Sequence, residues 1–413
     1  MLYIIILMTT FVICKLSLDM HQINYIKNLS ISDEEMNKLK VDQNFIEKSN
    51  SYATHKLYLS TASTLITIIF VFFVLLSDGF NKMHFFSEHI GLDVIGANLA
   101  TILIFYIMFS IINIPSLYFK TFYIEEKFGF NQMTKGLFVR DALITTTLSM
   151  IVITIVFKLF EILFITYTEF WWFYLWVMFI LLNLVTAYIY PSLIAPIFNK
   201  FEKLDDDLLN TSIYELTNKL NFPINDLYVM DGSKRSSHSN AYFSGLFGKK
   251  RIVFFDTLLK SLSIDEIRSV LAHEIGHYKK NHIFKSTMLF SFISLIFLYA
   301  FYNFFNIFSV DINITYDLQS SFVAVLFILI SPMLSFFLSP LLSAFSRKNE
   351  FQADDYAKAH TDSKDLISSL LKLSKGNLSL VKSSPIYSNF YSSHPSVFDR
   401  INNLLEKSDE RSQ

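Results

Sequence analysis

The sequence is poor in cysteine, in charge, and in glycine and proline, and each shortage excludes something. Its single cysteine, Cys14, cannot form an internal disulfide or a zinc or iron–sulfur site built from several thiolates, so metal ligands must be His, Asp or Glu. Charged residues make up only 17% of the chain, against about 25% in soluble domains, which argues against a soluble cytosolic enzyme. The 10 glycines and 8 prolines are scattered, and we find no repeat, low-complexity tract or long linker.

The net charge is also close to zero, because 35 basic residues stand against 36 acidic residues. The chain therefore has no positive field to attract nucleic acid, and we expect no nucleic-acid partner. Apolar residues are abundant instead: 52% of the 413 residues are hydrophobic, 16% are aromatic, and the mean hydropathy is +0.39. This composition excludes intrinsic disorder and favours a protein whose partner is the lipid bilayer.

The apolar residues cluster in runs long enough to cross a bilayer, for which a helix needs about 20 residues. Five uncharged runs have that length: 57–76, 94–119, 170–190, 286–310 and 318–346. The uncharged run 142–157 is shorter. We interpret it as part of a further span, whose outer end carries Lys158 and Glu161 as a snorkelling pair. Residues 1–14 lack a basic first segment and a clear cleavage site, so we expect a retained helix rather than a signal peptide. Seven spans are predicted, because large buried core helices do not explain so many charge-free runs.

The charges of the loops predict how these helices are oriented. If the N-terminus is outside, the outer loops 78–93, 165–169 and about 311–317 contain one basic residue, Lys82, whereas the inner segments are rich in lysine and arginine. We therefore expect the two large polar segments on the cytosolic side. The chain then divides into a five-helix membrane region, a polar segment, the sixth and seventh helices, and a second polar segment, at 1–199, 200–285, 286–346 and 347–413.

The first polar segment is expected to be a small mixed α/β unit attached to a mainly α protein. Residues 205–220 have helical spacing, and 226–230 and 251–255 are typical of short strands. Residues 240–247 would then form the partner strand of a hairpin, with Gly248-Lys249 in the turn.

A metal-binding motif lies near the end of this segment, in the sequence LAHEIGHYKKNH. His273, Glu274 and His277 form H-E-x-x-H, and on a helix two histidines four residues apart share a face and can bind one zinc ion. Glu274 would lie near a zinc-bound water, where it can act as a general base. A capping box at Ser263 and Glu266 marks the start of the helix. The alternative is a chance motif on a surface helix, expected on the order of once per hundred such chains.

A catalytic zinc needs a third protein ligand, and the topology indicates Glu350. Span 286–310 leads away from the zinc helix and span 318–346 returns, so Glu350 reaches the same membrane boundary as the motif. Asp354 follows one helical turn later, where it can accept a hydrogen bond from a ligand histidine. Gly276, inside the motif, would let another chain approach the metal closely. The alternative is a solvated acidic helix start, where carboxylates are common.

These residues, with several others, resemble the integral-membrane zinc metallopeptidases of the CAAX prenyl protease type I family. The matching segments are FIEKS at 45–49, IEEKFGFN at 124–131, PSLIAPIFNKFEKL at 191–204, SKRSSHSNAYFSG at 233–245, HEIGH at 273–277 and SRKNEFQADDYA at 346–357. They follow the family's order over nearly the whole chain. The resemblance implies seven helices around an intramembrane chamber, capped on its cytosolic side by the zinc domain. It also implies one Zn²⁺ per chain, held by His273, His277 and Glu350.

The resemblance also suggests residues that support the chemistry. His394, in a Ser-His-Pro sequence, would stabilise the developing oxyanion, and Arg400 would assist or orient the site; a surface-loop histidine and an arginine on an exposed helix are the alternatives. Asn240, Ala241 and Phe243 resemble the family's edge strand beside the metal, to which an extended peptide adds through backbone hydrogen bonds. His238 is expected to be a polar loop histidine. The other histidines have no ligand spacing: His21, His55, His84, His89, His282 and His360.

We therefore expect a membrane zinc endopeptidase that cleaves peptide or protein substrates at the cytosolic face of a bacterial inner membrane or of the endoplasmic reticulum. In the family the substrate is a prenylated CAAX protein, cut before its last three residues. Three alternatives stay open: a general quality-control protease similar to HtpX, an intramembrane site-2-type protease, and a seven-helix transporter or receptor that has lost catalysis. The charges flanking the motif argue against the second, and the intact ligand set argues against the third.

Overall fold

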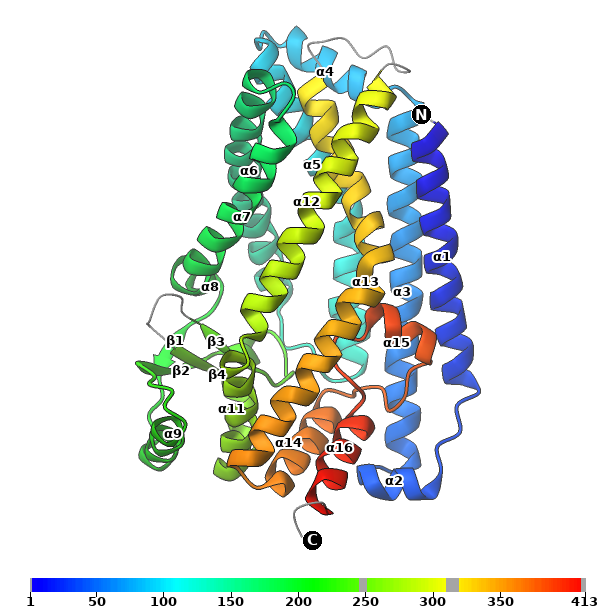
Figure 1. Ribbon diagram of the computed structural model, residues 1–413. Helices are drawn as coiled ribbons and strands as arrows, with labels where there is room; N and C mark the ends of the chain where they lie inside the picture. Colours follow the sequence, from blue (N-terminus) through cyan, green and yellow to red (C-terminus); the bar gives the residue numbers. More distant parts are fainter. Residues whose placement is uncertain (1, 245–250, 310–318, 410–413) are drawn as a thin grey trace.

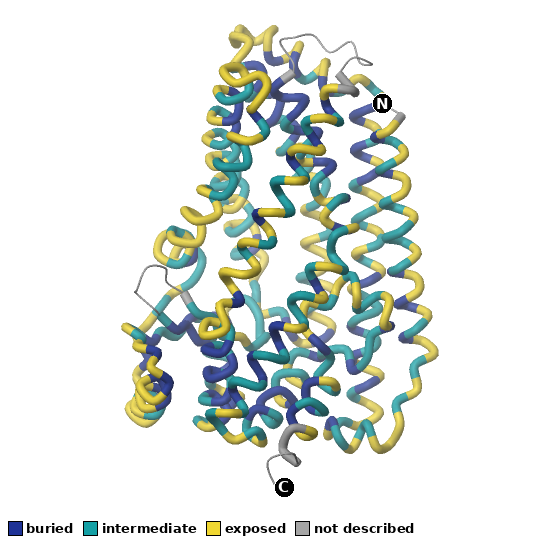
Figure 2. Tube along the Cα trace, viewed as in Figure 1, coloured by how far each residue is buried: buried dark blue, intermediate teal, exposed yellow. Residues whose placement is uncertain are grey.

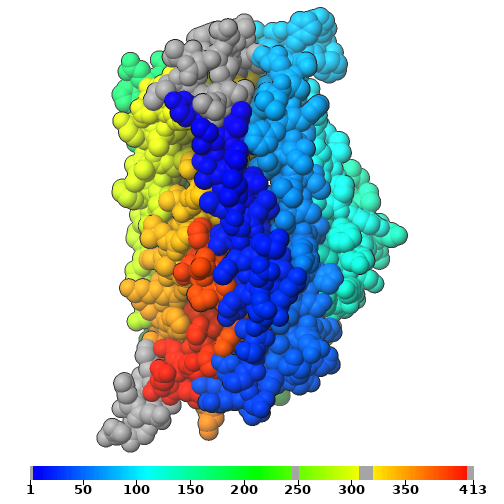
Figure 3. Space-filling view, turned by 90° about the vertical axis from the view of Figure 1, so that its right-hand side faces the viewer, coloured from blue at the N-terminus to red at the C-terminus, as the bar shows by residue number. Residues whose placement is uncertain are grey.

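Long helices form the bulk of the computed structural model, which describes residues 2–244, 251–309 and 319–409 (Figure 1). Seven of them are long and apolar enough to cross a membrane, as the sequence predicts. They are α1 (Leu2–Lys27), α3 (Gln43–Leu76), α5 (Val94–Phe119), α6 (Lys135–Thr166), α7 (Trp171–Ile189), α12 (His282–Ser309) and α13 (Gln319–His360). In the space-filling view, α1 lies along α3 and beside the C-terminal part of the chain (Figure 3).

Several of these helices extend well beyond the charge-free runs that predicted them. The short run at 142–157 lies inside α6, a continuous helix of 32 residues. The seventh helix, α13, has 42 residues and continues to His360 although it contains Pro332 and Pro340. Because α13 does not end at the expected membrane boundary, one rigid element links the membrane part of the chain to Glu350.

Glu161 does not reach outward from the end of a span. Its side chain is 3% exposed, and its carboxylate accepts hydrogen bonds from Asn98 of α5 and Ser320 of α13, each at 3.3 Å. Ser321 Oγ donates in turn to Asn98 Oδ1 at 2.9 Å. The expected snorkelling pair with Lys158 is therefore wrong for Glu161, which instead ties three membrane helices together.

The small sheet has four strands in the order β1-β2-β4-β3. β2 and β4 are parallel, and β3 and β4 are antiparallel with Ala241 opposite Phe254. The strands are β1 (Phe201–Lys203), β2 (Asp226–Met230), β3 (Ala241–Ser244) and β4 (Arg251–Phe255), and the helix predicted at 205–220 is α9 (Asp207–Lys219), between β1 and β2. The expected turn at Gly248-Lys249 lies outside the described residues. In the described part of the chain β3 pairs only with β4, so it is an edge strand.

Both polar segments lie at the same end of the long helices and share one hydrophobic core (Figures 1 and 2). Phe254 of the sheet and Leu271 of the zinc-motif helix pack in this core with Ala357, Leu366 and Leu404 from the C-terminal segment. The helices of the two segments are α10 (Asp256–Ser261), α11 (Ile264–Lys279), α14 (Ser363–Gly376), α15 (Pro385–Tyr391) and α16 (Val397–Asp409). Short connecting elements complete the chain: α2 (Asp33–Leu39), α4 (Gly79–His89), α8 (Ala195–Phe198), and the turns η1 (Lys120–Glu125), η2 (Tyr190–Ile194) and η3 (Gly232–Lys234).

Candidate metal centre

The helix that carries H-E-x-x-H is fixed at its first turn. Ser263 and Glu266 form the predicted capping box, with the Glu266 amide donating to Ser263 Oγ and the Ser263 amide donating to Glu266 Oε2. Glu266 is buried and also accepts hydrogen bonds from Ser368 and Lys372 of α14. Burial alone would raise the pKa of Glu266, but these bonds outweigh it and hold the pKa below its usual value. The start of α11 is thereby tied to the C-terminal segment.

Three side chains from two helices converge as the sequence predicts. His273 Nε2 and His277 Nε2 of α11 lie 3.2 Å apart, and Glu350 of α13 places one oxygen 3.3 Å from His277 Nε2 and the other 3.5 Å from His273 Nε2. Atoms bound tetrahedrally to one zinc ion at roughly 2.0–2.1 Å lie about 3.3 Å apart. Each imidazole nitrogen therefore lies at about this spacing from the other nitrogen and from one Glu350 oxygen, and one ligand atom from each of the three residues lies within 4.8 Å of the others.

The state of Glu350 supports a cation at this point. Its side chain is 4% exposed, and no described group donates to Oε2 with hydrogen-bonding geometry, although His394 Nδ1 at 3.0 Å and Arg400 Nη1 at 3.5 Å lie close to it. A buried carboxylate oxygen without a donor is costly unless a metal ion completes its contacts. Glu350 is therefore not part of a solvated helix start, and the donor set of two imidazoles and one carboxylate fits a divalent metal such as zinc.

Asp354 and Arg400 fix the ring of His273 on the side of Nδ1, away from the metal position. Asp354 is 0% exposed, and its Oδ1 accepts from His273 Nδ1 at 2.8 Å. Arg400 of α16 donates to both oxygens of Asp354, at 2.8 and 2.6 Å. Burial would lower the pKa of His273, but the hydrogen bonds with Asp354 and Glu350 outweigh it and raise the pKa to about 9. The surroundings of His273 therefore favour positive charge, as a metal site requires.

A glycine allows the two ligand-bearing helices to approach. A Cβ on Gly276 would lie 3.0 Å from Tyr356 Cβ and 3.1 Å from Ala353 Cα on α13. Ala353 and Ala357 are also fully buried in this contact region. Gly276 therefore allows the close contact between α11 and α13.

A chain of hydrogen bonds that the sequence did not indicate runs from Nδ1 of His277 through His282 to Gln352. His282 Nδ1 lies 3.0 Å from His277 Nδ1, and His282 Nε2 lies 3.0 Å from the side-chain oxygen of Gln352. With Nε2 of His277 facing the metal position, this chain fixes the orientation of its ring, as Asp354 does for His273. The five-residue separation of His277 and His282 gave no signal, because His282 begins a new helix, α12.

Glu274 and His394 are placed differently around the ligands. Glu274 is half-buried on α11, and within the described ranges no side chain or amide donates to its carboxylate, which leaves the oxygens available. The side chain of His394 is 65% exposed, with Nδ1 turned to Glu350. His394 thus reaches the metal site from a loop, although it lies 44 residues (394 − 350) after Glu350.

The predicted substrate strand has its side chains arranged by the pleat of the sheet. Asn240 is exposed, its side-chain oxygen accepts from the Ala241 amide at 2.8 Å, and its carbonyl accepts from the Phe255 amide at 3.0 Å. Ala241 and Phe243 point to the other side, where they pack on the core, and Phe243 contacts the Phe222 ring. Ala241 and Phe243 can therefore meet a substrate only through their backbone.

His238 anchors the loop that leads into this strand. Its Nε2 lies 3.3 Å from Glu125 Oε2, its Nδ1 lies 3.1 Å from Asn377 Oδ1, and its ring stacks on Phe130 with centroids 4.0 Å apart. Tyr52 Oη also donates to Glu125, at 2.9 Å. His238 is therefore a polar loop histidine, as expected, and it connects the strand to membrane helix α3 through Glu125 and Tyr52.

Two sequence profiles of known families match the chain. The one described as CAAX prenyl protease N-terminal, five membrane helices, matches residues 22–200. The one described as peptidase family M48 matches residues 203–408. The two matches meet where α8 is followed by the first strand of the sheet.

Characterised relatives match over most of their length. A CAAX prenyl protease 1 homolog from Dictyostelium discoideum is 34% identical over 402 residues, covering 94% of this chain and 93% of the relative. CAAX prenyl protease 1 from Saccharomyces cerevisiae is 37% identical over 313 residues, covering 71% of this chain and 69% of the relative. The crystal structure of S. mikatae Ste24p matches with a TM-score of 0.86 at 30% identity, covering 97% of this chain and 98% of that chain. The predicted mainly α, seven-helix fold is confirmed.

Proposed function

Since this chain belongs to peptidase family M48 and is a multi-pass membrane metalloprotease, we propose that it removes the C-terminal tripeptide from prenylated CAAX proteins. The observation that supports this most is the convergence of His273, His277 and Glu350 at one end of seven membrane helices. We assign one zinc ion to these three residues. We place the site on the cytosolic side, because lysine and arginine are concentrated in the segments at this end.

Glu274 is the proton carrier in this proposal. A bound zinc ion supplies a Lewis acid that acidifies water and polarises the scissile carbonyl. Glu274 lies one residue after His273, and its oxygens have no other described donor, so its carboxylate accepts the water proton and passes it to the leaving amine. Asp354 and Arg400 keep the imidazole of His273 in the tautomer whose Nε2 faces the metal position.

His394 and the edge strand would handle the substrate. His394 Nδ1 faces Glu350, and its ring lies in an exposed loop, so its second nitrogen can donate to the carbonyl oxygen on which negative charge develops. The backbone of Ala241 and Phe243 would offer the edge of the sheet to an extended peptide, and the side chain of Asn240, which now holds the Ala241 amide, would bind the substrate backbone.

Glu274→Gln tests the proposed function in the purified, zinc-loaded chain. Wild-type protein should cleave a farnesylated CAAX peptide after the modified cysteine. The variant should keep its zinc but lose about 10²- to 10⁴-fold in kcat, because Gln cannot accept the proton. Turnover is followed by mass spectrometry of the released tripeptide, and zinc content by elemental analysis. His273→Ala is the matched control, which should lose the metal as well.

The outcomes separate the alternatives. Full activity in Glu274→Gln would overturn the assigned chemistry, and so would a wild-type chain that holds no zinc. Equal cleavage of the farnesylated peptide and its unmodified twin would favour a general quality-control protease. A transporter or receptor should show no cleavage at all and should be indifferent to Glu274→Gln.

A further inference from the structure

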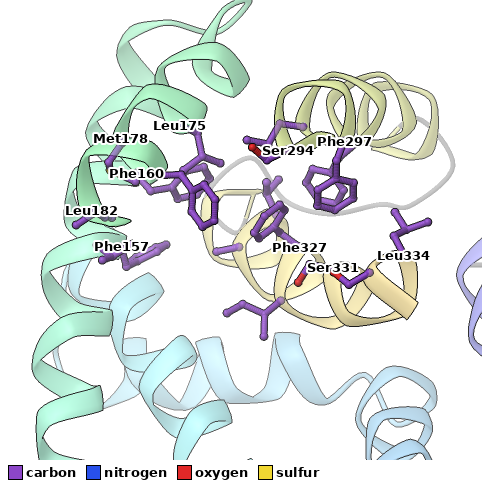
Figure 4. Close-up of a pocket in the computed structure, with 18 of the residues that line it drawn as sticks. Phe157, Phe160, Leu175, Met178, Leu182, Ser294, Phe297, Phe327, Ser331 and Leu334 are labelled. Carbon is purple, nitrogen blue, oxygen red and sulfur yellow. The ribbon is translucent and has the colours of Figure 1, made fainter. Parts of the chain in front are cut away.

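An apolar cavity of about 490 Å³ lies among α5, α6, α7, α12 and α13, apart from the zinc ligands (Figure 4). Phe160, Phe297 and Phe327 are among the side chains that surround it. No described residue that lines the cavity carries a charge, and its few polar groups include the hydroxyls of Ser294 and Ser331. Its volume falls in the range of roughly 300–1,000 Å³ that is typical of small-molecule sites.

The cavity is closed at the end that is distant from the zinc ligands. At that end Trp171, Phe301 and Val323 are 2%, 3% and 1% exposed. The lining residues nearest to the zinc ligands along α12 and α13 are Phe290, which is 45% exposed, and the half-buried Leu338, three residues after the exposed Ser335 of the lining. A long apolar chain can therefore enter from the side of the zinc site and end against the buried aromatic residues.

Two of the five helices that line the cavity, α12 and α13, also lead to the metal position. α12 follows directly after the H-E-x-x-H helix, and α13 carries Glu350. Leu338, which lines the cavity, precedes Glu350 by 12 residues (350 − 338), or about 18 Å at 1.5 Å per residue. The isoprenoid of a CAAX protein is attached to the cysteine of the motif, the residue whose carbonyl is cleaved in the proposed function. An isoprenoid that begins beside the zinc therefore meets the cavity first at its near end, by Leu338 and Phe290, and a longer isoprenoid extends further into it.

We propose that this cavity binds the isoprenoid chain of the substrate, an inference that rests on the proposed function. The bilayer is as apolar as the cavity, so moving the chain from one to the other gains little hydrophobic energy. What binding gains is the position of the substrate, because an isoprenoid held between α12 and α13 keeps the modified cysteine near Glu350. Enzymes use binding energy far from the reacting bond to orient that bond in this way. A four-unit chain penetrates further towards Trp171 than a three-unit chain.

The test fills the cavity and compares two substrates. Ser331→Phe adds a ring to the lining, and Thr147→Phe makes the same kind of change at an exposed position of α6 outside the lining. For each purified, zinc-loaded full chain, kcat/KM is measured for a farnesylated CAAX peptide and for its unmodified twin. We expect the ratio of the two values to fall at least about tenfold in Ser331→Phe, and more for a geranylgeranylated peptide. Thr147→Phe should keep the wild-type ratio.

A ratio unchanged in Ser331→Phe would overturn the inference. A bilayer lipid chain is the competing occupant, since Val152 and Ile328 in the lining are exposed as well. In that case a lipid should co-purify with the wild type and be lost from Ser331→Phe, while the ratio of the two kcat/KM values stays the same. This result would also overturn the inference. If the wild type cleaves neither peptide, the proposed function itself fails.

Photocrosslinking gives an answer that does not depend on folding of the variant. A peptide with a photoreactive group on the last isoprene unit should label the wild-type chain on α12 or α13 between Phe290 and Leu338. Labelling confined to residues outside the cavity would contradict the inference even if Ser331→Phe does not fold.

Discussion

Asp354 shows how a single residue that is not a ligand can control a metal site. It is fully buried between His273 and Arg400, and both contacts depend on its charge. Asp354→Asn keeps the volume but leaves Arg400 only its longer ion pair with Glu350, at 3.5 Å, and weakens the hold on the His273 ring. We expect zinc affinity to fall about 10- to 100-fold, as is typical when a partner of a ligand histidine is lost. Competition with a chelator of known affinity measures the change.

Asp355→Asn is the control for this change. Asp355 is the next residue of α13 and accepts a hydrogen bond from Asn403 instead of from a metal ligand. It should bind zinc as the wild type does. Equal affinity in Asp354→Asn and Asp355→Asn would mean that Asp354 serves packing alone.

At this scale, spacing along one helix was readable from the sequence, but contacts between helices were readable only in part. His273 and His277 followed from the helical period, and Glu350 followed from counting membrane crossings. The contacts of His282 and Gln352 were missed, because they depend on the angle at which α12 leaves α11 and on the packing of α13.

At the scale of the element, the charge on Glu266 should stabilise the start of α11. Its pKa is lowered in the folded chain, so this contribution is present above the unfolded value of about 4.5 and is lost as the pH falls through the folded value. Glu266→Gln keeps the capping box, since Gln also serves there, but loses the ion pair with Lys372. We expect the variant to lose about 1–2 kcal/mol at pH 7 and progressively less as the pH falls below about 4.5.

Thermal unfolding in detergent, followed at several pH values, measures this difference. Glu215→Gln is a suitable control because Glu215 is exposed on α9, and its unfolding curve should follow the wild type throughout. A gap between wild type and Glu266→Gln that widens on acidification would have the wrong sign for a stabilising carboxylate.

Helices were predicted better than their ends. Charge-free runs identified all seven long helices, but Lys158 and Glu161 made α6 look shorter than it is. A charge inside a membrane helix is acceptable where a partner is present, and the partners of Glu161 come from α5 and α13, far away in the sequence. The order of the strands was not predictable for the same reason, since β2 pairs with β4 across a long connection.

At the scale of the whole molecule, the two ends of the helix bundle hold different kinds of polar contact. One end has the buried cluster of Glu161, Asn98 and Ser320, which joins helices without any ligand geometry. The other end has the metal ligands and the shared core of both polar segments. The sequence predicted only the second of these, because the spans alternate direction, which brings residues 200–285 and 347–413 to the same side.

Cysteine labelling can test which side of the membrane carries the metal centre, because the chain has a single cysteine to remove. Cys14→Ser gives a cysteine-free background in which Lys82→Cys on α4 and Lys219→Cys on α9 place one thiol at each end of the molecule, both at exposed positions (Figure 1). In sealed vesicles whose cytosolic face is outward, a membrane-impermeant maleimide should label Lys219→Cys at once. It should label Lys82→Cys only after detergent opens the vesicles, because the basic segments stay on the cytosolic side. The reverse pattern would move the metal centre to the opposite face and would leave its ligand geometry unchanged.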